Sequence, residues 1–69
     1  MSPEEFQELI AEAIEEYGEQ RLSEVLQKGK GTLRRWASKE SSPMPIIRDY
    51  CTKKLDHLAL ETIYSKIEG

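Results

Sequence analysis

The stretch Lys28–Pro43, KGKGTLRRWASKESSP, decides how this chain folds. It sets five cationic side chains around the only tryptophan of a chain whose formal net charge is −3. Its two glycines in three residues predict a turn. After the turn, Leu33, Trp36 and Ala37 follow a three-plus-one spacing, which is typical of a short helix that buries one side. We therefore predict a helix from about Lys30 to Ser38.

The outward positions of this short helix carry mostly cationic or polar side chains. They are Lys30, Gly31, Arg34, Arg35 and Ser38. Trp36 belongs to the inner side, where we expect its ring to anchor the helix on the first and fourth helices of the chain. An exposed cationic helix suits a polyanion, although a solvated face on a purely structural helix is the alternative interpretation.

A second helix is predicted directly upstream, from Gln20 to Gln27. Leu22, Val25 and Leu26 lie on one face of it, and the glycine-containing turn interrupts that pattern. The two predicted helices and the turn between them span residues 20–38.

The amino terminus carries a strong helix start. Ser2 is suited to the N-cap, Pro3 to the first helical position, and Glu5 to a capping box with Ser2. One apolar stripe follows at spacings of three and four, comprising Phe6, Leu9, Ile10, Ala13, Ile14 and Tyr17. Gly18 can adopt the left-handed conformation that ends the helix. The glutamates of this segment are expected to form a solvated face.

Beyond the basic helix, Lys39–Met44 is predicted to be a loop, and Pro45 suits the first turn of the next helix. The apolar positions that follow keep a helical spacing as far as Ile67. They form either one helix of about twenty residues or two helices that meet near Lys54–Asp56, with Asp56 as a cap; we favour the break. The pattern shows no strand-like alternation, so we predict an all-α fold of four or five helices.

Charge is strongly segregated along the chain. Residues 1–19 carry seven glutamates and no cation, residues 20–54 carry nine cations against three acids, and residues 55–69 carry one lysine against three acids. We expect a dipolar molecule with one basic face, and such a face matters more at a polyanion than the total charge does.

Length and composition limit the remaining possibilities. A 69-residue chain with 38% apolar residues fits one small folded domain, residues 1–69. The single cysteine, Cys51, cannot form an intramolecular disulfide, and the Cys and His residues lack the spacing of zinc ligands. Apolar runs of two or three residues predict no membrane span, and the acidic amino terminus is unlike a signal peptide. We expect a cytoplasmic protein.

The order of helix, tight turn, basic helix and proline-ended loop resembles the helix-turn-helix of the Cro and lambda-repressor family of prokaryotic and phage regulators. The likeness covers Gln20 to about Leu55. Leu22, Leu26 and the small Ser23 match buried positions of that family's first motif helix, and Thr32–Trp36 looks like its recognition helix. The resemblance implies a lambda-repressor-like fold and a set of DNA-binding residues. They are Gly29, Lys30, Gly31, Thr32, Arg34, Arg35, Ser38 and Lys39.

Three positions depart from the family pattern. Gln27 occupies a turn position where the family usually has glycine, so we expect Gly29 to meet that need. Lys28 replaces a usual aliphatic residue. Glu19 stands where a polar residue often meets the DNA backbone, and its charge would repel phosphate.

We therefore expect sequence-specific binding of double-stranded DNA by a small phage or prokaryotic transcriptional regulator, such as a repressor. The alternative is a helical interaction module that docks on a partner protein through its acidic first helix or its last helix. A homodimer is also expected, pairing through residues Leu58 to Ile67 of a dimerisation helix at 56–67, on an inverted-repeat site.

Residues with catalytic potential are sparse. The GKGT sequence lacks the spacing and the preceding strand of a phosphate-binding loop, and His57 stands alone without a nucleophile at a readable distance. The glutamates are dispersed along a helix. We expect no enzyme activity, no cofactor, no metal site and no small-molecule substrate.

Overall fold

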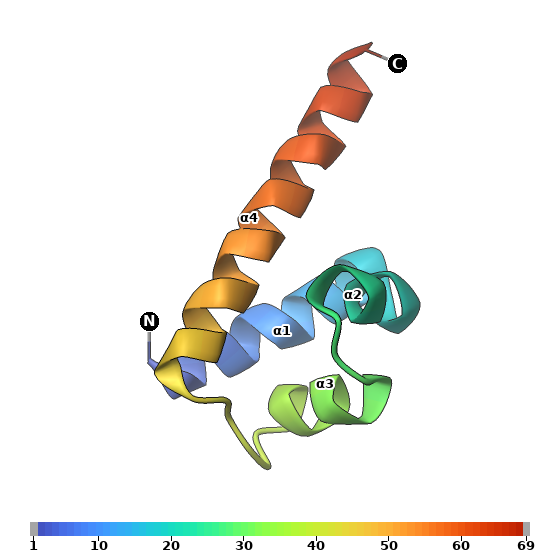
Figure 1. Ribbon diagram of the computed structural model, residues 1–69. Coiled ribbons are helices and arrows are strands. Elements are labelled where there is room, and N and C mark those ends of the chain that lie inside the picture. The colour runs from blue at the N-terminus through green and yellow to red at the C-terminus, as the bar shows by residue number, and fades with distance from the viewer. Residues whose placement is uncertain (1, 69) are drawn as a thin grey trace.

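The structure, a computed structural model, describes residues 2–68 and contains four α-helices and no strand within that range. They are α1 (Pro3–Tyr17), α2 (Glu19–Leu26), α3 (Lys30–Ala37) and α4 (Pro45–Glu68). Figure 1 shows α1, α2 and α3 gathered beside the first half of α4, whose second half continues away from them. The prediction of an all-α fold is confirmed.

Local caps set both ends of α1. The Glu5 N–H donates to Ser2 Oγ at 3.2 Å and the Ser2 N–H donates to Glu5 Oε1 at 3.4 Å, which completes the capping box. These bonds hold the pKa of Glu5 below its ordinary value. At the other end Gly18 has a φ of 87°, and its N–H donates to the Ile14 carbonyl. Its ψ of 153° is extended, so Gly18 ends α1 with a positive φ but outside the left-handed helical region.

The turn between α2 and α3 depends on Gln27. This residue takes the left-handed conformation, with φ 56° and ψ 42°, whereas Gly29 is extended at φ −64° and forms the N-cap of α3. The expectation that Gly29 meets the glycine need of the turn is therefore wrong. Ser23 stabilises the turn from inside: its hydroxyl donates to the Lys28 carbonyl at 2.6 Å, and its own carbonyl accepts from the Lys28 N–H.

The core lies where the four helices meet. Its buried members are Phe6, Ile10, Ala13, Leu22, Leu26, Leu33, Trp36, Cys51 and Leu55. The Trp36 ring meets the Phe6 ring edge to face, with the centroids 5.6 Å apart and the planes at 66°. Such a contact adds about 0.5–1.5 kcal/mol beyond the burial itself. The predicted core role of Trp36 is confirmed.

Helix α4 is continuous from Pro45 to Glu68, so the favoured break near Lys54–Asp56 is wrong. The segment holds no glycine, and its only proline stands at the first position, so the backbone ladder is not interrupted. Asp56 is an exposed residue within the helix and caps nothing. A helix of this length is about 36 Å long, and the longest extent of the molecule is 39 Å.

The loop between α3 and α4 is held by hydrogen bonds from α1 and from α4. Gln7, a buried residue of α1, donates from Nε2 to the Ser41 carbonyl at 2.8 Å, and Arg48 of α4 donates to the Pro43 carbonyl at 2.8 Å. These bonds fix the path by which the chain leaves α3. Among residues 2–68, none of the helices has the length and apolarity needed to cross a membrane.

Candidate nucleic-acid interface

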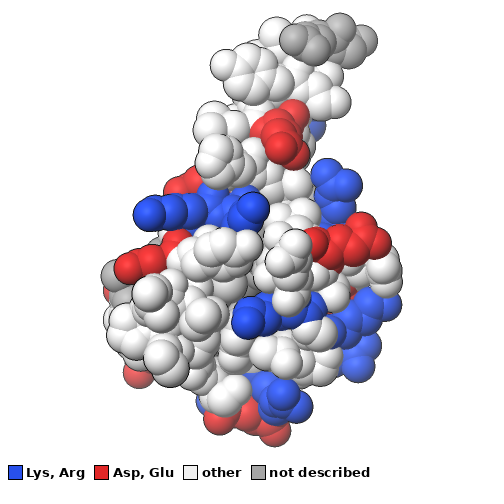
Figure 2. All heavy atoms as spheres, viewed as in Figure 1, with Lys and Arg blue, Asp and Glu red and all other residues white. Residues whose placement is uncertain are grey.

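The outer face of α3 is exposed because its inner face is anchored. Leu33 and Trp36 are buried, and the positions between and before them point outward by helical spacing. The exposed members are Lys30, Gly31, Arg34 and Arg35, and Thr32 is half-buried beside them. Figure 2 shows cationic side chains spread over the lower half of the molecule, where Figure 1 places α2 and α3.

The amino-terminal end of α3 is open to an approaching ligand. The first bond of the helix runs from the Leu33 N–H to the Gly29 carbonyl at 3.1 Å, so the N–H groups of residues 30–32 precede the intrahelical ladder. Glycine at the N-cap brings no side chain to cover them. A Cβ built on Gly31 would also meet no atom within 4 Å, so the backbone there faces open space. This end of α3 has the N–H groups and the dipole that favour an anion.

Arg34 is held by Glu19, the first residue of α2. Arg34 Nε donates to Glu19 Oε1 and Oε2 at 3.0 Å each, and Arg34 Nη2 donates to Oε2 at 2.6 Å. The hydrogen bonds from Arg34 lower the pKa of the Glu19 carboxyl, and the same bonds raise the pKa of Arg34. The Arg34 side chain is 64% exposed, yet its donors are directed at a carboxylate of the same chain.

Arg35 is the less constrained guanidinium of α3. Its Nη2 donates to Thr32 Oγ1 at 3.3 Å, a single long bond between exposed groups one helical turn apart. The bond is easily exchanged for a ligand, because an exposed neutral acceptor holds a cation only weakly. Arg35 therefore has most of its donors available on the outer face of α3.

The last two residues of the predicted DNA-binding set lie where α3 ends. Ser38 is the C-cap, and its hydroxyl donates to the Arg35 carbonyl at 3.2 Å. Lys39 has a positive φ of 69°, and its Nζ lies 3.8 Å from Glu8 Oε1 of α1. The predicted set therefore divides into a group on the exposed face of α3, residues 29–35, and a pair at its carboxyl end.

Two contacts that shape this face were not predicted from the sequence. Gln7 is buried and holds the loop after α3, and Glu19 holds Arg34. Gln7 stands three residues before Ile10 and seven before Ile14, so its helical spacing could have placed it at the edge of the apolar stripe. No local pattern could have paired Glu19 with Arg34, because fifteen residues separate them.

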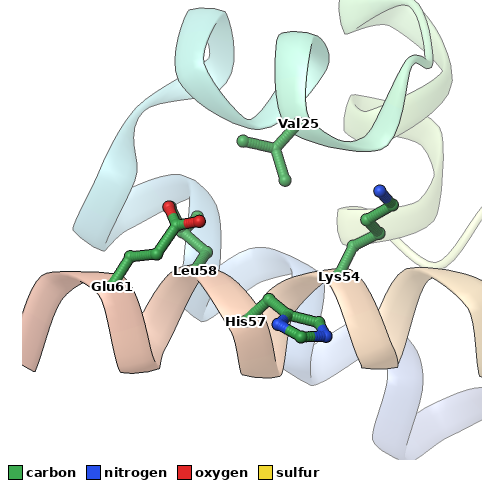
Figure 3. Close-up of a pocket in the computed structure, with 5 residues that line it drawn as sticks. All are labelled: Val25, Lys54, His57, Leu58 and Glu61. Carbon is green, nitrogen blue, oxygen red and sulfur yellow. The ribbon is translucent and has the colours of Figure 1, made fainter.

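A surface hollow of about 400 Å³ lies between α2 and α4, away from α3. Figure 3 shows Val25 of α2 above α4, with Lys54 and Glu61 reaching up on either side of Leu58 and with His57 turned sideways. Within residues 2–68 no group of three or more His, Cys, Asp or Glu side chains could hold a metal ion. Burial raises the pKa of the Cys51 thiol, which keeps it protonated and unreactive.

Comparison with protein-family models, with curated proteins and with solved structures finds no match to this chain. The candidate interface is a short helix with three exposed cations, of which Arg34 is held by Glu19, and an open amino terminus, positioned by a buried tryptophan.

Proposed function

We propose that this chain is a helix-turn-helix protein that binds double-stranded DNA by sequence and acts as a small phage or prokaryotic transcriptional regulator. The observation that carries the proposal is the two-sided character of α3. Leu33 and Trp36 hold one side in the core, and Lys30 and Arg35 stand exposed on the other. An α-helix fits the major groove, and a guanidinium donates two bonds to O6 and N7 of guanine.

Each exposed group has a defined role in this proposal. Arg35 and Lys30 read base edges, and the backbone of Gly31 allows a close approach because no atom lies within 4 Å of its Cβ position. The N-cap at Gly29 receives a phosphate on the free N–H groups of α3. Lys39 contacts the DNA backbone and positions the helix without reading sequence.

Because Arg34 is paired with Glu19, it does not contact a DNA phosphate in this proposal. The Glu19 carboxylate is itself neutralised by this pairing, so it repels the DNA backbone less than an isolated carboxylate would. The pair also ties the start of α2 to the middle of α3, which fixes the relative position of the two motif helices.

The test is selection of bound sites from a random duplex pool, followed by substitution. On the selected site, Arg35→Ala weakens binding by about 1–3 kcal/mol and relaxes the preference at one base pair. Lys39→Ala weakens binding to all duplexes about equally. Lys54→Ala serves as the charge-matched control, because Lys54 is exposed on α4 and lies outside the predicted DNA-binding set. If Arg35→Ala reduced binding to selected and random duplexes alike, Arg35 would not read bases.

A protein-interaction module is the second candidate, and the acidic face of α1 favours it. Six glutamates of α1 are exposed, namely Glu4, Glu5, Glu8, Glu12, Glu15 and Glu16. Such a face suits a basic partner protein. Retention on heparin and on random-sequence duplex at low salt separates the candidates, because an interaction module with a net charge of −3 flows through both.

A further inference from the structure

Helix α4 is apolar on two opposite faces. Cys51, Leu55 and Leu58 are buried against the other helices. On the far side of the second half, four apolar side chains are between 53% and 75% exposed: Leu60, Ile63, Tyr64 and Ile67. Their spacing of i, i+3, i+4 and i+7 places them on a single stripe.

This outer stripe lies on the part of α4 that extends past the core. Leu58 is the last buried side chain of α4, so the predicted dimerisation surface beginning at Leu58 is corrected to begin at Leu60. Figures 1 and 2 show the end of α4 projecting from the other helices with a largely uncharged surface. Because most helical stability comes from packing of an apolar face, a projecting helix of this kind gains from a partner on its stripe.

A hollow at the base of the stripe has the shape of a packing site. It measures about 180 Å³ and is lined by Lys53, Asp56, His57 and Leu60. Four residues at i, i+3, i+4 and i+7 form the hole that receives one side chain in helix-to-helix packing. Three of the four lining residues have polar or charged side chains, and Leu60 is the apolar one.

We infer that a second copy of this chain covers the outer stripe, with the two α4 helices antiparallel. Leu60 of each copy lies against Ile63 of the other, and Ile67 of each copy enters the other copy's hollow. In this register Asp56 comes beside Lys66 of the second copy, twice by symmetry, and opposite charges flank the apolar centre.

Charge at the base of the stripe favours the antiparallel arrangement. Parallel helices set Asp56 against Asp56 and Lys53 against Lys53 of the second copy, and like charges at a seam repel. The antiparallel pairing also leaves the buried face of each α4 in contact with its own core, because that face lies opposite the stripe.

The size of the stripe is sufficient for self-association. Complete burial of these four side chains in both copies removes at most about 1,000 Å² from water, which is the lower limit for a specific interface. A pairing of this size dissociates at low protein concentration. The inference does not depend on DNA binding, and its test uses no DNA.

Sedimentation equilibrium of the full chain from about 1 μM to about 1 mM tests the pairing, since small interfaces dissociate in that range. We expect a monomer–dimer equilibrium that Ile63→Glu weakens by about 100-fold. Ile46→Glu is the matched control, because Ile46 is 70% exposed on the same helix but lies outside the stripe, and it leaves the equilibrium unchanged. A wild-type monomer throughout, or equal effects of both variants, overturns the inference.

Disulfide formation tests the orientation independently of charge substitution. Leu60→Cys and Ile63→Cys are prepared separately, and the native Cys51 stays protected because it is buried. The antiparallel pairing predicts that the mixture oxidises to a Leu60→Cys/Ile63→Cys heterodimer at least tenfold faster than either variant alone forms a homodimer. Faster disulfide formation within each single variant shows a parallel pair and overturns the inference.

Discussion

Gln27 holds the turn between α2 and α3 in the left-handed conformation, with φ 56° and ψ 42°. This conformation costs a non-glycine residue about 1–2 kcal/mol, and glycine avoids that cost. Part of the gain is offset because glycine loses more backbone entropy on folding. The Gln27 side chain is exposed, so its removal sacrifices little packing.

Gln27→Gly is therefore expected to raise the free energy of unfolding by about 0.5–1 kcal/mol, measured by urea denaturation monitored with circular dichroism. Gln27→Val is the opposite control, since a β-branched residue tolerates a positive φ least, and it lowers the midpoint. Equal midpoints for all three proteins would show that the turn does not hold residue 27 in this conformation.

Glu19 and Arg34 form a bidentate ion pair between α2 and α3, so a change at Glu19 is expected to alter both DNA binding and the pH response. Glu19→Gln releases the Arg34 guanidinium toward DNA. We expect tighter binding to all duplexes and a salt slope that steepens by about one unit, without a change in preferred sequence. Glu24→Gln on the exposed side of α2 is the charge-matched control.

The same pair gives a pH signature. The hydrogen bonds from Arg34 hold the pKa of Glu19 below its ordinary value. The pair therefore stabilises the fold above that ordinary value, and its contribution is lost as pH falls through the lower folded-state pKa. Between pH 7 and pH 3 the thermal midpoint of the wild type should fall more than that of Glu19→Gln. Parallel curves for the two proteins would indicate that the pair does not form in solution.

At the scale of elements, α3 depends on α1 for its position. The edge-to-face contact of Trp36 with Phe6 and the burial of Leu33 join the two helices. Gln7 of α1 then fixes the loop that leaves α3. The proposed DNA-reading helix is therefore presented by the acidic first helix rather than by its own turn alone.

Trp36→Ala is expected to destabilise the fold by about 3–5 kcal/mol, which is close to the whole stability of a domain this small. DNA binding is then lost through unfolding. The measurement is a far-UV circular dichroism melt, and Trp36→Phe serves as a control that keeps an aromatic ring beside Phe6 and loses less. An unchanged midpoint for Trp36→Ala would place the tryptophan outside the core.

At the scale of the molecule, α4 links the proposed DNA-facing end to the proposed self-associating end. The proposed recognition helix packs on α1 and α2, and the apolar stripe lies on the second half of α4, which projects away from them (Figure 1). A two-fold pair of such chains presents two recognition helices related by symmetry, which matches an inverted-repeat site.

Pairing should therefore raise DNA affinity through multivalency. Ile63→Glu is expected to weaken binding to the selected inverted repeat by about 100-fold while binding to an isolated half-site stays unchanged. Fluorescence anisotropy with both duplexes measures the two affinities, and Ile46→Glu is the control. Equal losses on both duplexes would indicate damage to the fold, and no loss on either would show that one chain suffices for binding.

The sequence by itself determined the features that depend on neighbours along the chain. Ser2 and Glu5 encode the start of α1, Pro45 encodes the start of α4, and the spacing of Leu33 and Trp36 decides which side of α3 is buried. Caps and helical periodicity act over a few residues, so a linear pattern contains them.

Only the tertiary structure decided which side chains of different helices contact one another. Glu19 and Arg34, fifteen residues apart in the sequence, form an ion pair, and Gln7 bonds to Ser41, thirty-four residues away. Leu58 is buried, although the sequence predicted that it would belong to an exposed dimer surface. Gln27 takes the left-handed turn because Ser23 and the packing of α2 on α3 hold the backbone there. Contacts between distant residues depend on the relative placement of whole helices, and that placement is set by the shared core rather than by any local pattern.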